Sequence, residues 1–141
     1  MEVQQNRFLT GSGGHVWING RLLTTLKKIE AKVTGTFEEH SFCGDYSTYN
    51  QYTGWSGEGT LTTGKVDSTV MKMALDSFKT GIFPEVKIIT KLTDKATGKS
   101  ERTSIEGVIF TEAILAGFEA KALIEEESPF KFSNYNILET I

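Results

Sequence analysis

The sequence has very little cysteine, histidine or proline. Its 141 residues include one cysteine, Cys43, two histidines, His15 and His40, and two prolines. A single cysteine excludes a disulfide within the chain and a zinc site built of cysteines alone. Two histidines leave few further ligands for a metal ion. We therefore expect neither a metal nor a cofactor.

Long apolar runs and an excess of positive charge are also missing. No stretch approaches the roughly 18 apolar residues that a membrane-spanning helix requires, so we expect no membrane insertion by this chain. The formal net charge is -3, whereas a free-standing nucleic-acid-binding domain usually carries a basic patch and a high isoelectric point. These absences disfavour whole classes of protein without naming a function.

What the chain does contain is typical of one folded domain. A length of 141 residues predicts a single core, and an aromatic content of 11% argues against disorder. Residues 1–14 are polar and end in a glycine-rich run, so we predict an N-terminal arm followed by one domain over residues 15–141. The arm contains two large apolar residues, Phe8 and Leu9, which we predict dock on a partner; the alternative is a frayed terminus.

Alternation of apolar and polar residues predicts strands over much of the domain. The pair Asn19-Gly20 between two apolar runs predicts a tight hairpin. Residues 28–38 then alternate, with apolar or small residues at the odd positions and polar residues, including Lys28, Glu30 and Lys32, at the even ones. This pattern predicts a long strand with one polar face of mixed charge.

The alternation ends at residue 41. Residues 41–59 are rich in glycine, serine and threonine, yet they contain Tyr46, Tyr49, Tyr52 and Trp55. A long irregular segment in a compact domain is usually functional, and tyrosine and tryptophan are enriched where proteins bind. We predict a long loop that contacts a partner; the alternative is a hairpin whose tyrosines lie on its own sheet.

One helix is predicted after this segment. Asp67 or Ser68 would cap it, apolar residues recur at three- and four-residue spacing up to Phe78, and Gly81 would end it. Further strands are predicted at residues 86–92, 102–110 and 130–138, whereas residues 113–123 are ambiguous because a central glycine disfavours a helix. The expected fold is mainly β, an antiparallel sandwich or barrel with one packed α-helix.

A segment that resembles a phosphate-binding loop fails the chemical requirements. Gly59 and Gly64 precede Lys65 at the spacing of that loop, but Val66 has no hydroxyl group to bind Mg²⁺. Nucleotide-binding folds also need parallel strands that alternate with several helices. We interpret the segment as a strand that leads into the helix.

Two other clusters are equally poor catalytic candidates. Residues three apart on a strand face opposite sides, so we interpret His40 and Cys43 as a surface imidazole and a small buried thiol, not as a nucleophile pair or, with Asp45, a metal site. The run Glu125-Glu126-Glu127 is interpreted as solvated charge. We predict no catalytic residue.

Five blocks of the sequence, in this order, carry a resemblance to one family. They are Gly14–Gly20, Ile29–Val33, Gly57–Thr62, the segment from Lys65 through the helix to Phe78, and Glu125–Phe132. Together they resemble the tail tube proteins of contractile phage tails over nearly the whole chain, and the closing block is the most specific. The chain departs from the family pattern at Gly64, where a bulkier residue is expected, and in its tyrosine-rich segment.

The resemblance implies hexameric rings that stack into a hollow tube inside a contractile sheath. The implied partners are further copies of the chain, the sheath protein, baseplate or tail-tip proteins and a terminator, with DNA as transient cargo if the particle is a phage. Residues 41–59 would contact the adjacent ring, Phe8 and Leu9 a neighbouring subunit, and Lys28, Glu30 and Lys32 would face the lumen or the sheath. The protein would be made in the bacterial host cytoplasm and reside in a phage tail or a phage-derived, R-type bacteriocin.

Other functions remain open on the sequence. A type VI secretion-like tube protein would share the architecture and differ in cargo. A small β-barrel that binds an apolar ligand would need an enclosed apolar cavity and a stable monomer. A hydrolase is the least favoured function, because the sequence offers no credible acid and base pair.

Overall fold

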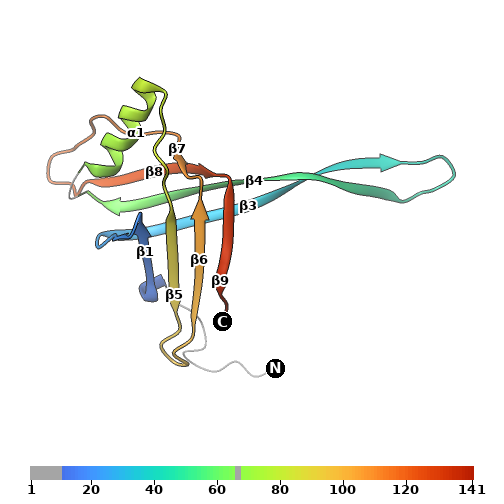
Figure 1. Ribbon diagram of the computed structural model, residues 1–141, viewed down its shortest axis with the longest axis horizontal. Helices are drawn as coiled ribbons and strands as arrows, with labels where there is room; N and C mark the ends of the chain where they lie inside the picture. Colours follow the sequence, from blue (N-terminus) through green and yellow to red (C-terminus); the bar gives the residue numbers. More distant parts are fainter. Residues whose placement is uncertain (1–10, 66–67) are drawn as a thin grey trace.

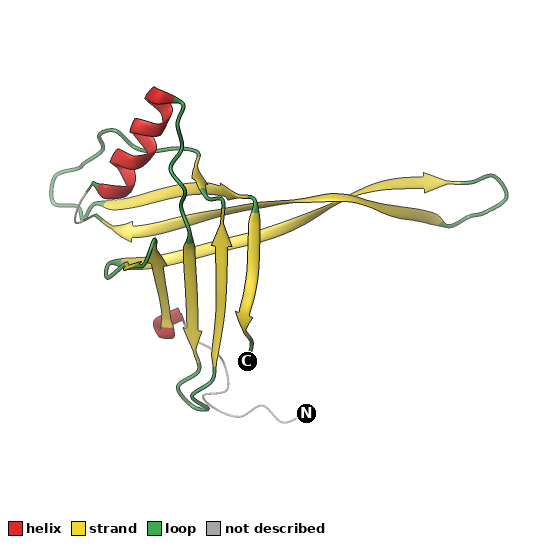
Figure 2. Ribbon diagram, viewed as in Figure 1, coloured by secondary structure: helices red, strands yellow, loops and turns green. Residues whose placement is uncertain are grey.

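The computed structural model describes residues 11–65 and 68–141 of the chain. Within them lie nine strands, one α-helix and a short 3-10 turn at Gly11–Gly13 (Figures 1 and 2). The strands are β1 (Gly14–Ile18), β2 (Arg21–Leu22), β3 (Leu26–Ser41), β4 (Thr48–Gly64), β5 (Ile88–Thr93), β6 (Ser100–Glu106), β7 (Ile109–Phe110), β8 (Glu125–Phe132) and β9 (Asn134–Glu139), and the helix is α1 (Thr69–Thr80). The mainly β fold with one helix is confirmed.

The strands form two antiparallel sheets that run across one another (Figure 1). One sheet has the order β2-β1-β5-β6-β9, and the other has the order β3-β4-β8-β7. The predicted hairpin at Asn19-Gly20 is present, since these two residues have φ angles of 50° and 84°, as a two-residue turn between twisted strands requires. The Asn19 side chain also accepts a hydrogen bond from the Lys87 amide at 2.9 Å and so ties this turn to the segment before β5.

Two corners carry the chain from one sheet to the other. The strands predicted at 102–110 and 130–138 were expected to be continuous, and this is wrong: each breaks, at Gly107 and at Ser133, and its two halves belong to different sheets. The corners abut, because the Ser133 amide donates to the carbonyl of Glu106 at 3.2 Å. Gly107 has a φ of 66°, and a Cβ there would lie 1.9 Å from the Ser133 hydroxyl. Only glycine fits this crossing.

The core lies where the two sheets cross. It is built from the inward side chains of both sheets, with contributions from α1 and the adjoining loops. Its buried members are Val16, Ile18, Leu61, Ala74, Val86, Ile88, Ile105, Val108, Phe110, Phe130 and Phe132. The core is therefore confined to one end of the long strands β3 and β4.

Two glycines of β4 face the two buried rings of β8. Gly57 pairs with Phe132 and Gly59 pairs with Phe130. A Cβ on Gly57 would lie 2.3 Å from the Phe132 ring, and one on Gly59 would lie 2.5 Å from the Phe130 ring. The rings thus occupy the space that side chains on β4 would take, and two of the sequence blocks that carry the family resemblance are neighbours in one sheet.

Helix α1 packs against one end of the four-stranded sheet (Figure 2). Ser68 occupies the N-cap position but its side chain makes no capping hydrogen bond, and Asp67 lies outside the described residues. Gly81 ends the helix as predicted, with a φ of 70° and its amide bonded to the carbonyl of Ser77. Ala74 is buried, whereas Phe78 is 44% exposed, so the predicted apolar face is only partly covered by this chain.

Candidate assembly surface

The outstanding feature of the molecule is a two-stranded ribbon that projects far beyond the core (Figure 1). Strands β3 and β4 pair from Leu26 with Thr63 to Ser41 with Thr48. Strand β8 pairs with β4 only from Gly57 to Gly64. Residues 34–56 therefore have no third strand beside them, and we call this segment the ribbon. An isolated two-stranded ribbon is marginally stable in water, so this segment contributes little stability of its own.

The ribbon changes the prediction for residues 41–59. Most of this segment is strand β4, and only residues 42–47 form the connecting turn. The prediction of a long loop is therefore wrong. The segment forms a hairpin, which was the alternative prediction. Sequence periodicity fails here because neither face of a free ribbon is buried by its own chain, so no alternation is imposed.

Aromatic side chains are exposed along the ribbon. Tyr46 is fully exposed at the turn, and Tyr49, Tyr52 and Phe37 are about half exposed or more. Phe37 and Tyr52 contact each other across the strands at 5.7 Å between ring centroids, and Tyr49 similarly contacts Phe42. The rings lie on their own ribbon and still present large apolar surface to solvent, which is typical of an interaction site.

Trp55 differs from the tyrosines because it stands at the base of the ribbon. Its ring contacts Phe132 at 6.2 Å and meets Tyr135 edge-on at 5.2 Å between centroids. It is also the least exposed of these aromatic residues, at 37%. Trp55 thus joins the ribbon to both sheets, since Phe132 ends β8 and Tyr135 belongs to β9.

We expect Trp55→Ser to destabilise the fold and Tyr46→Ser to leave its stability nearly unchanged. Loss of the partly buried Trp55 ring should destabilise the fold by about 1–3 kcal/mol, whereas loss of the exposed Tyr46 ring should change stability by less than about 0.5 kcal/mol. Chemical denaturation of the two variants measures this difference. Equal losses of stability would show that Trp55 is not an anchor.

The ribbon turn is fixed by Asp45. Its carboxylate accepts a hydrogen bond from the Ser47 amide at 2.9 Å and another from the Tyr49 hydroxyl. These bonds stabilise the ionised carboxylate, so the Tyr49 hydroxyl first, and then the Ser47 amide, lower the pKa of Asp45 below its usual 3.8. The hydrogen bond between Tyr49 and Asp45 also raises the pKa of Tyr49 above its usual 10.0.

This arrangement predicts a pH window for the turn. A lowered pKa in the native state means that Asp45 stabilises the turn above the pKa of the unfolded chain and that this contribution is lost as pH falls through the native value. We expect the Ser47 amide resonance to shift in NMR spectra in a step below pH 3.8. The Asp45→Asn variant is the control and should show no step; a step in that variant would assign the titration to another group.

The three charged residues predicted for the lumen or the sheath lie on the outward face of the four-stranded sheet. Lys28, Glu30 and Lys32 are all exposed on β3. Lys32 forms an ion pair with Glu58 of β4 at 3.5 Å, and β8 adds Lys131 beside Glu58 in the register. This face thus carries both signs of charge in alternation.

A second charged surface was missed at the sequence level. On the outward face of the five-stranded sheet, His15 of β1 pairs with Lys91 of β5, and Lys91 pairs with Arg102 of β6. We call these three residues the basic row. No local pattern signals it, because its members come together only through the pairing of strands that are distant in the sequence.

The other residues considered as catalytic or metal-binding candidates form no recognisable site within the part of the chain that the structure describes. No group of three or more potential metal ligands is found within residues 11–65 and 68–141. Cys43 is exposed, so the expected buried thiol is wrong: the residue lies in the ribbon turn, where nothing covers it. Lys65 is the lysine of the segment that resembles a phosphate-binding loop, and its amine lies 3.7 Å from the sulfur of Met71. Phe8, Leu9 and Val66 lie outside the described residues.

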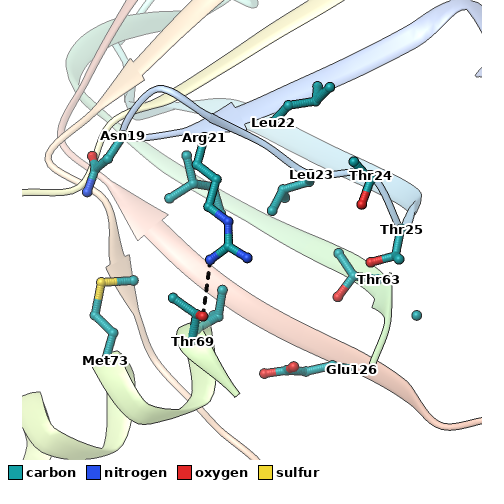
Figure 3. A pocket seen from close by; sticks show the side chains of 13 residues that line it. Asn19, Arg21, Leu22, Leu23, Thr24, Thr25, Thr63, Thr69, Met73 and Glu126 are labelled. Atoms are coloured by element: carbon teal, nitrogen blue, oxygen red, sulfur yellow. Dashed lines mark hydrogen bonds between the residues drawn. The ribbon is translucent and has the colours of Figure 1, made fainter. Parts of the chain in front are cut away.

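One cavity of about 330 Å³ lies between the β1–β2 turn and the start of α1 (Figure 3). Arg21 reaches across it, and its guanidinium donates to the Thr69 hydroxyl at 3.2 Å. The cavity is lined by side chains such as Leu23, Thr25 and Met73. It sits at the margin of the two open sheets and is not enclosed by a barrel.

In the part of the chain that is described, no helix has the length and apolarity to span a membrane.

Comparison with known proteins places these features in a family context. A family model described as "Phage tail tube protein" matches residues 1–139. Two proteins of Bacillus subtilis (strain 168) are similar over the whole chain and 97% of their own length: "Uncharacterized protein YqbM", 29% identical, and "Phage-like element PBSX protein XkdM", 28% identical.

Solved structures share the fold at low sequence identity. The tube terminating cap of the anti-feeding prophage is similar with a TM-score of 0.78 and 11% identity, over 99% of this chain and 95% of that one. A chain of the sheath-tube complex of an extracellular contractile injection system, PVC, in its extended state is similar with a TM-score of 0.73 and 13% identity, over 95% and 93% of the two chains.

Proposed function

We propose, from the premise that this chain belongs to the phage tail tube protein family, that it is the inner-tube subunit of a contractile phage tail or a phage-derived, R-type bacteriocin. Copies would close into hexameric rings, and the rings would stack into a hollow tube. The family is structural, and the proposed role involves no catalysis.

The projecting ribbon is the observation that carries this proposal. It places exposed aromatic rings beyond the core, where no part of the same sheet covers them. Such a surface is costly in a monomer and is stabilised when a second copy covers it. We therefore propose that Tyr46, Tyr49, Tyr52 and the outer face of Trp55 contact the adjacent ring. Phe8 and Leu9 of the arm are proposed to contact a neighbouring subunit.

Open sheet edges support ring closure. The strands at the edges are β2 and β9 in one sheet and β3 and β7 in the other. Edge strands present unpaired backbone groups that another chain can bind, and a closed ring of copies would cover them. Beyond the core, Val33 on the inward face of β3 is 43% exposed, which provides apolar surface next to one such edge.

The mixed charge of the four-stranded sheet suits the wall of a water-filled channel. We propose that Lys28, Glu30 and Lys32 face the lumen. A wall on which lysines stand beside glutamates does not neutralise a run of phosphates, so DNA could pass as transient cargo without tight binding. Sheath, baseplate or tail-tip, and terminator proteins are the further proposed partners, and assembly would take place in the bacterial host.

Electron microscopy of the purified protein tests the proposal. We expect negative-stain images over a concentration series to show hollow tubes of uniform width with sixfold end views, and mass photometry to show six-copy rings as an intermediate. A tail-tip protein should be added as an initiator if nucleation is slow. A monomer at every concentration, with and without the initiator, would overturn the assignment.

A further inference from the structure

We propose that the ribbon of one copy docks on the basic row of a second copy, on the outward face of its five-stranded sheet. The inference rests on the proposed function and deepens it by naming the surface that receives the ribbon. It comes from charge and exposed aromatic surface on two parts of the same chain.

The basic row is electrostatically unfavourable in the isolated chain. Lys91 and Arg102 stand directly opposite each other on β5 and β6, and like charges in this position destabilise a sheet. Within the described residues the Nε atom of Arg102 is shielded from solvent and has no hydrogen-bond partner. Glu139 stands opposite Arg102 on β9, but no ion pair joins the two. Within the described residues neither Lys91 nor Arg102 forms an ion pair, so negative charge from a second copy can reach the accessible parts of these two half-buried side chains.

Apolar surface adjoins the row on the same face. Trp17 and Ile89 pair with each other one row above His15 and Lys91, and both are half-buried. The His15 and Trp17 rings lie 6.1 Å apart. A face that combines an indole ring with a lysine and an arginine favours a partner that brings aromatic rings and carboxylates together.

The ribbon has this composition. Residues 34–56 contain Glu38, Glu39 and Asp45 but no lysine or arginine, and they contain six aromatic residues. Neither Glu38 nor Glu39 is paired with a cation among the described residues, and both are exposed. Glu38 and Glu39 are consecutive in β3 and therefore lie on opposite faces of the ribbon. By the strand register, Glu39 shares its face with Phe37 and Tyr52, and Glu38 shares its face with Tyr49. Each face thus combines a carboxylate with aromatic rings, and complementary charge of this kind sets register and specificity.

The arrangement of the elements makes this a contact between copies. The ribbon extends away from the five-stranded sheet (Figure 1), so it does not cover the basic row of its own chain. Two different surfaces of one chain that bind each other give a head-to-tail contact, and such contacts close into rings or continue as filaments. The pairing of ribbon and row is therefore suited to a stacked tube.

A charge exchange between the two surfaces tests the inference. We expect Glu38→Lys with Glu39→Lys to lower the fraction of protein in tubes at least about tenfold at low salt, and Lys91→Glu with Arg102→Glu to do the same, because like charges then face each other. Combining all four substitutions in one chain should restore assembly to within about threefold of the unaltered protein. Sedimentation and negative-stain images measure the assembled fraction.

A matched control separates this contact from general charge effects. Lys72→Glu with Lys79→Glu changes the net charge by the same amount as Lys91→Glu with Arg102→Glu, but at exposed positions of α1, and it should leave assembly within about twofold of normal. If the variant with all four substitutions stays unassembled while the unaltered protein forms tubes, the proposed docking surface is wrong and the proposed function stands. If the unaltered protein itself forms no tubes, the proposed function fails first.

A single substitution distinguishes docking from a structural role. Lys91→Glu replaces the like-charge pair with an opposite-charge pair across β5 and β6, so we expect the melting temperature of the unassembled protein to rise by roughly 1–3 °C. The same change reverses one charge of the row and should lower tube yield. A loss of both stability and assembly would instead mean that Lys91 supports the fold, and would overturn its role in docking.

Discussion

A chain in which residues 36–54 are replaced by Asn-Gly is expected to fold normally and to form no tubes. Gly35 and Trp55 face each other in the register, so a two-residue turn can join them directly. The replacement removes most of the ribbon and keeps the Trp55 anchor. Because the lost segment lies outside the core, stability should change little, whereas the assembled fraction should fall at least about 100-fold, which corresponds to about 2.7 kcal/mol of lost contact energy.

A shorter deletion provides the matched control for this experiment. Ser41 and Thr48 also face each other, so Asn-Gly can replace residues 42–47 and remove only the turn. This variant keeps the paired rings of Phe37 and Tyr52 along with Glu38 and Glu39. We expect it to assemble more weakly than the full chain and better than the longer deletion, as judged by electron microscopy and sedimentation. Full tubes from the longer deletion would show that the ribbon is dispensable.

The second large effect is expected in the core, at the contact between Gly57 and Phe132. Phe132→Ala should destabilise the fold by about 3–5 kcal/mol, because it removes a buried ring. Gly57→Ala should cost about 1–3 kcal/mol, because its three nearest atoms, at 2.3–2.6 Å from a new Cβ, all belong to that ring. The double variant should therefore cost at least about 1 kcal/mol less than the two single changes together.

The neighbouring glycine supplies the control for this cycle. A Cβ on Gly59 would lie 2.5 Å from the Phe130 ring and also 2.4 Å from the backbone carbonyl oxygen of Glu30. Removing the Phe130 ring leaves the backbone obstacle in place, so Gly59→Ala with Phe130→Ala should show a smaller relief. Urea denaturation of the six variants measures both cycles. Strict additivity at Gly57 and Phe132 would show that β4 moves to accommodate the new side chain.

Local sequence predicted the features that depend on local chemistry. The turn at Asn19-Gly20 follows from the tolerance of these residues for positive φ, and the end of α1 follows from Gly81 in the left-handed conformation. The long strand that carries Lys28, Glu30 and Lys32 follows from its alternation, because one of its faces covers the core for part of its length. The family was also recognisable, because its blocks follow one another in a fixed order along the chain, and two of them, Gly57–Thr62 and Glu125–Phe132, are neighbours in one sheet.

Other features depended on which strands pair and were invisible in the sequence. The breaks at Gly107 and Ser133 exist because two chain segments cross at the same corner. The ribbon exists because β8 stops pairing with β4 at Gly57. No residue near Tyr49 in the sequence indicates where this pairing ends. The basic row likewise joins residues from β1, β5 and β6.

The sequence by itself determined the first hairpin turn, the long strand, the helix and the family, because each follows from the properties of neighbouring residues. The tertiary structure alone decided which strand segments are left without partners and which charges stand opposite one another. The physical reason is that register is a property of pairs of distant segments: a shift of one residue would move every side chain to the other face. The surfaces proposed for assembly, the ribbon and the basic row, are both consequences of that register.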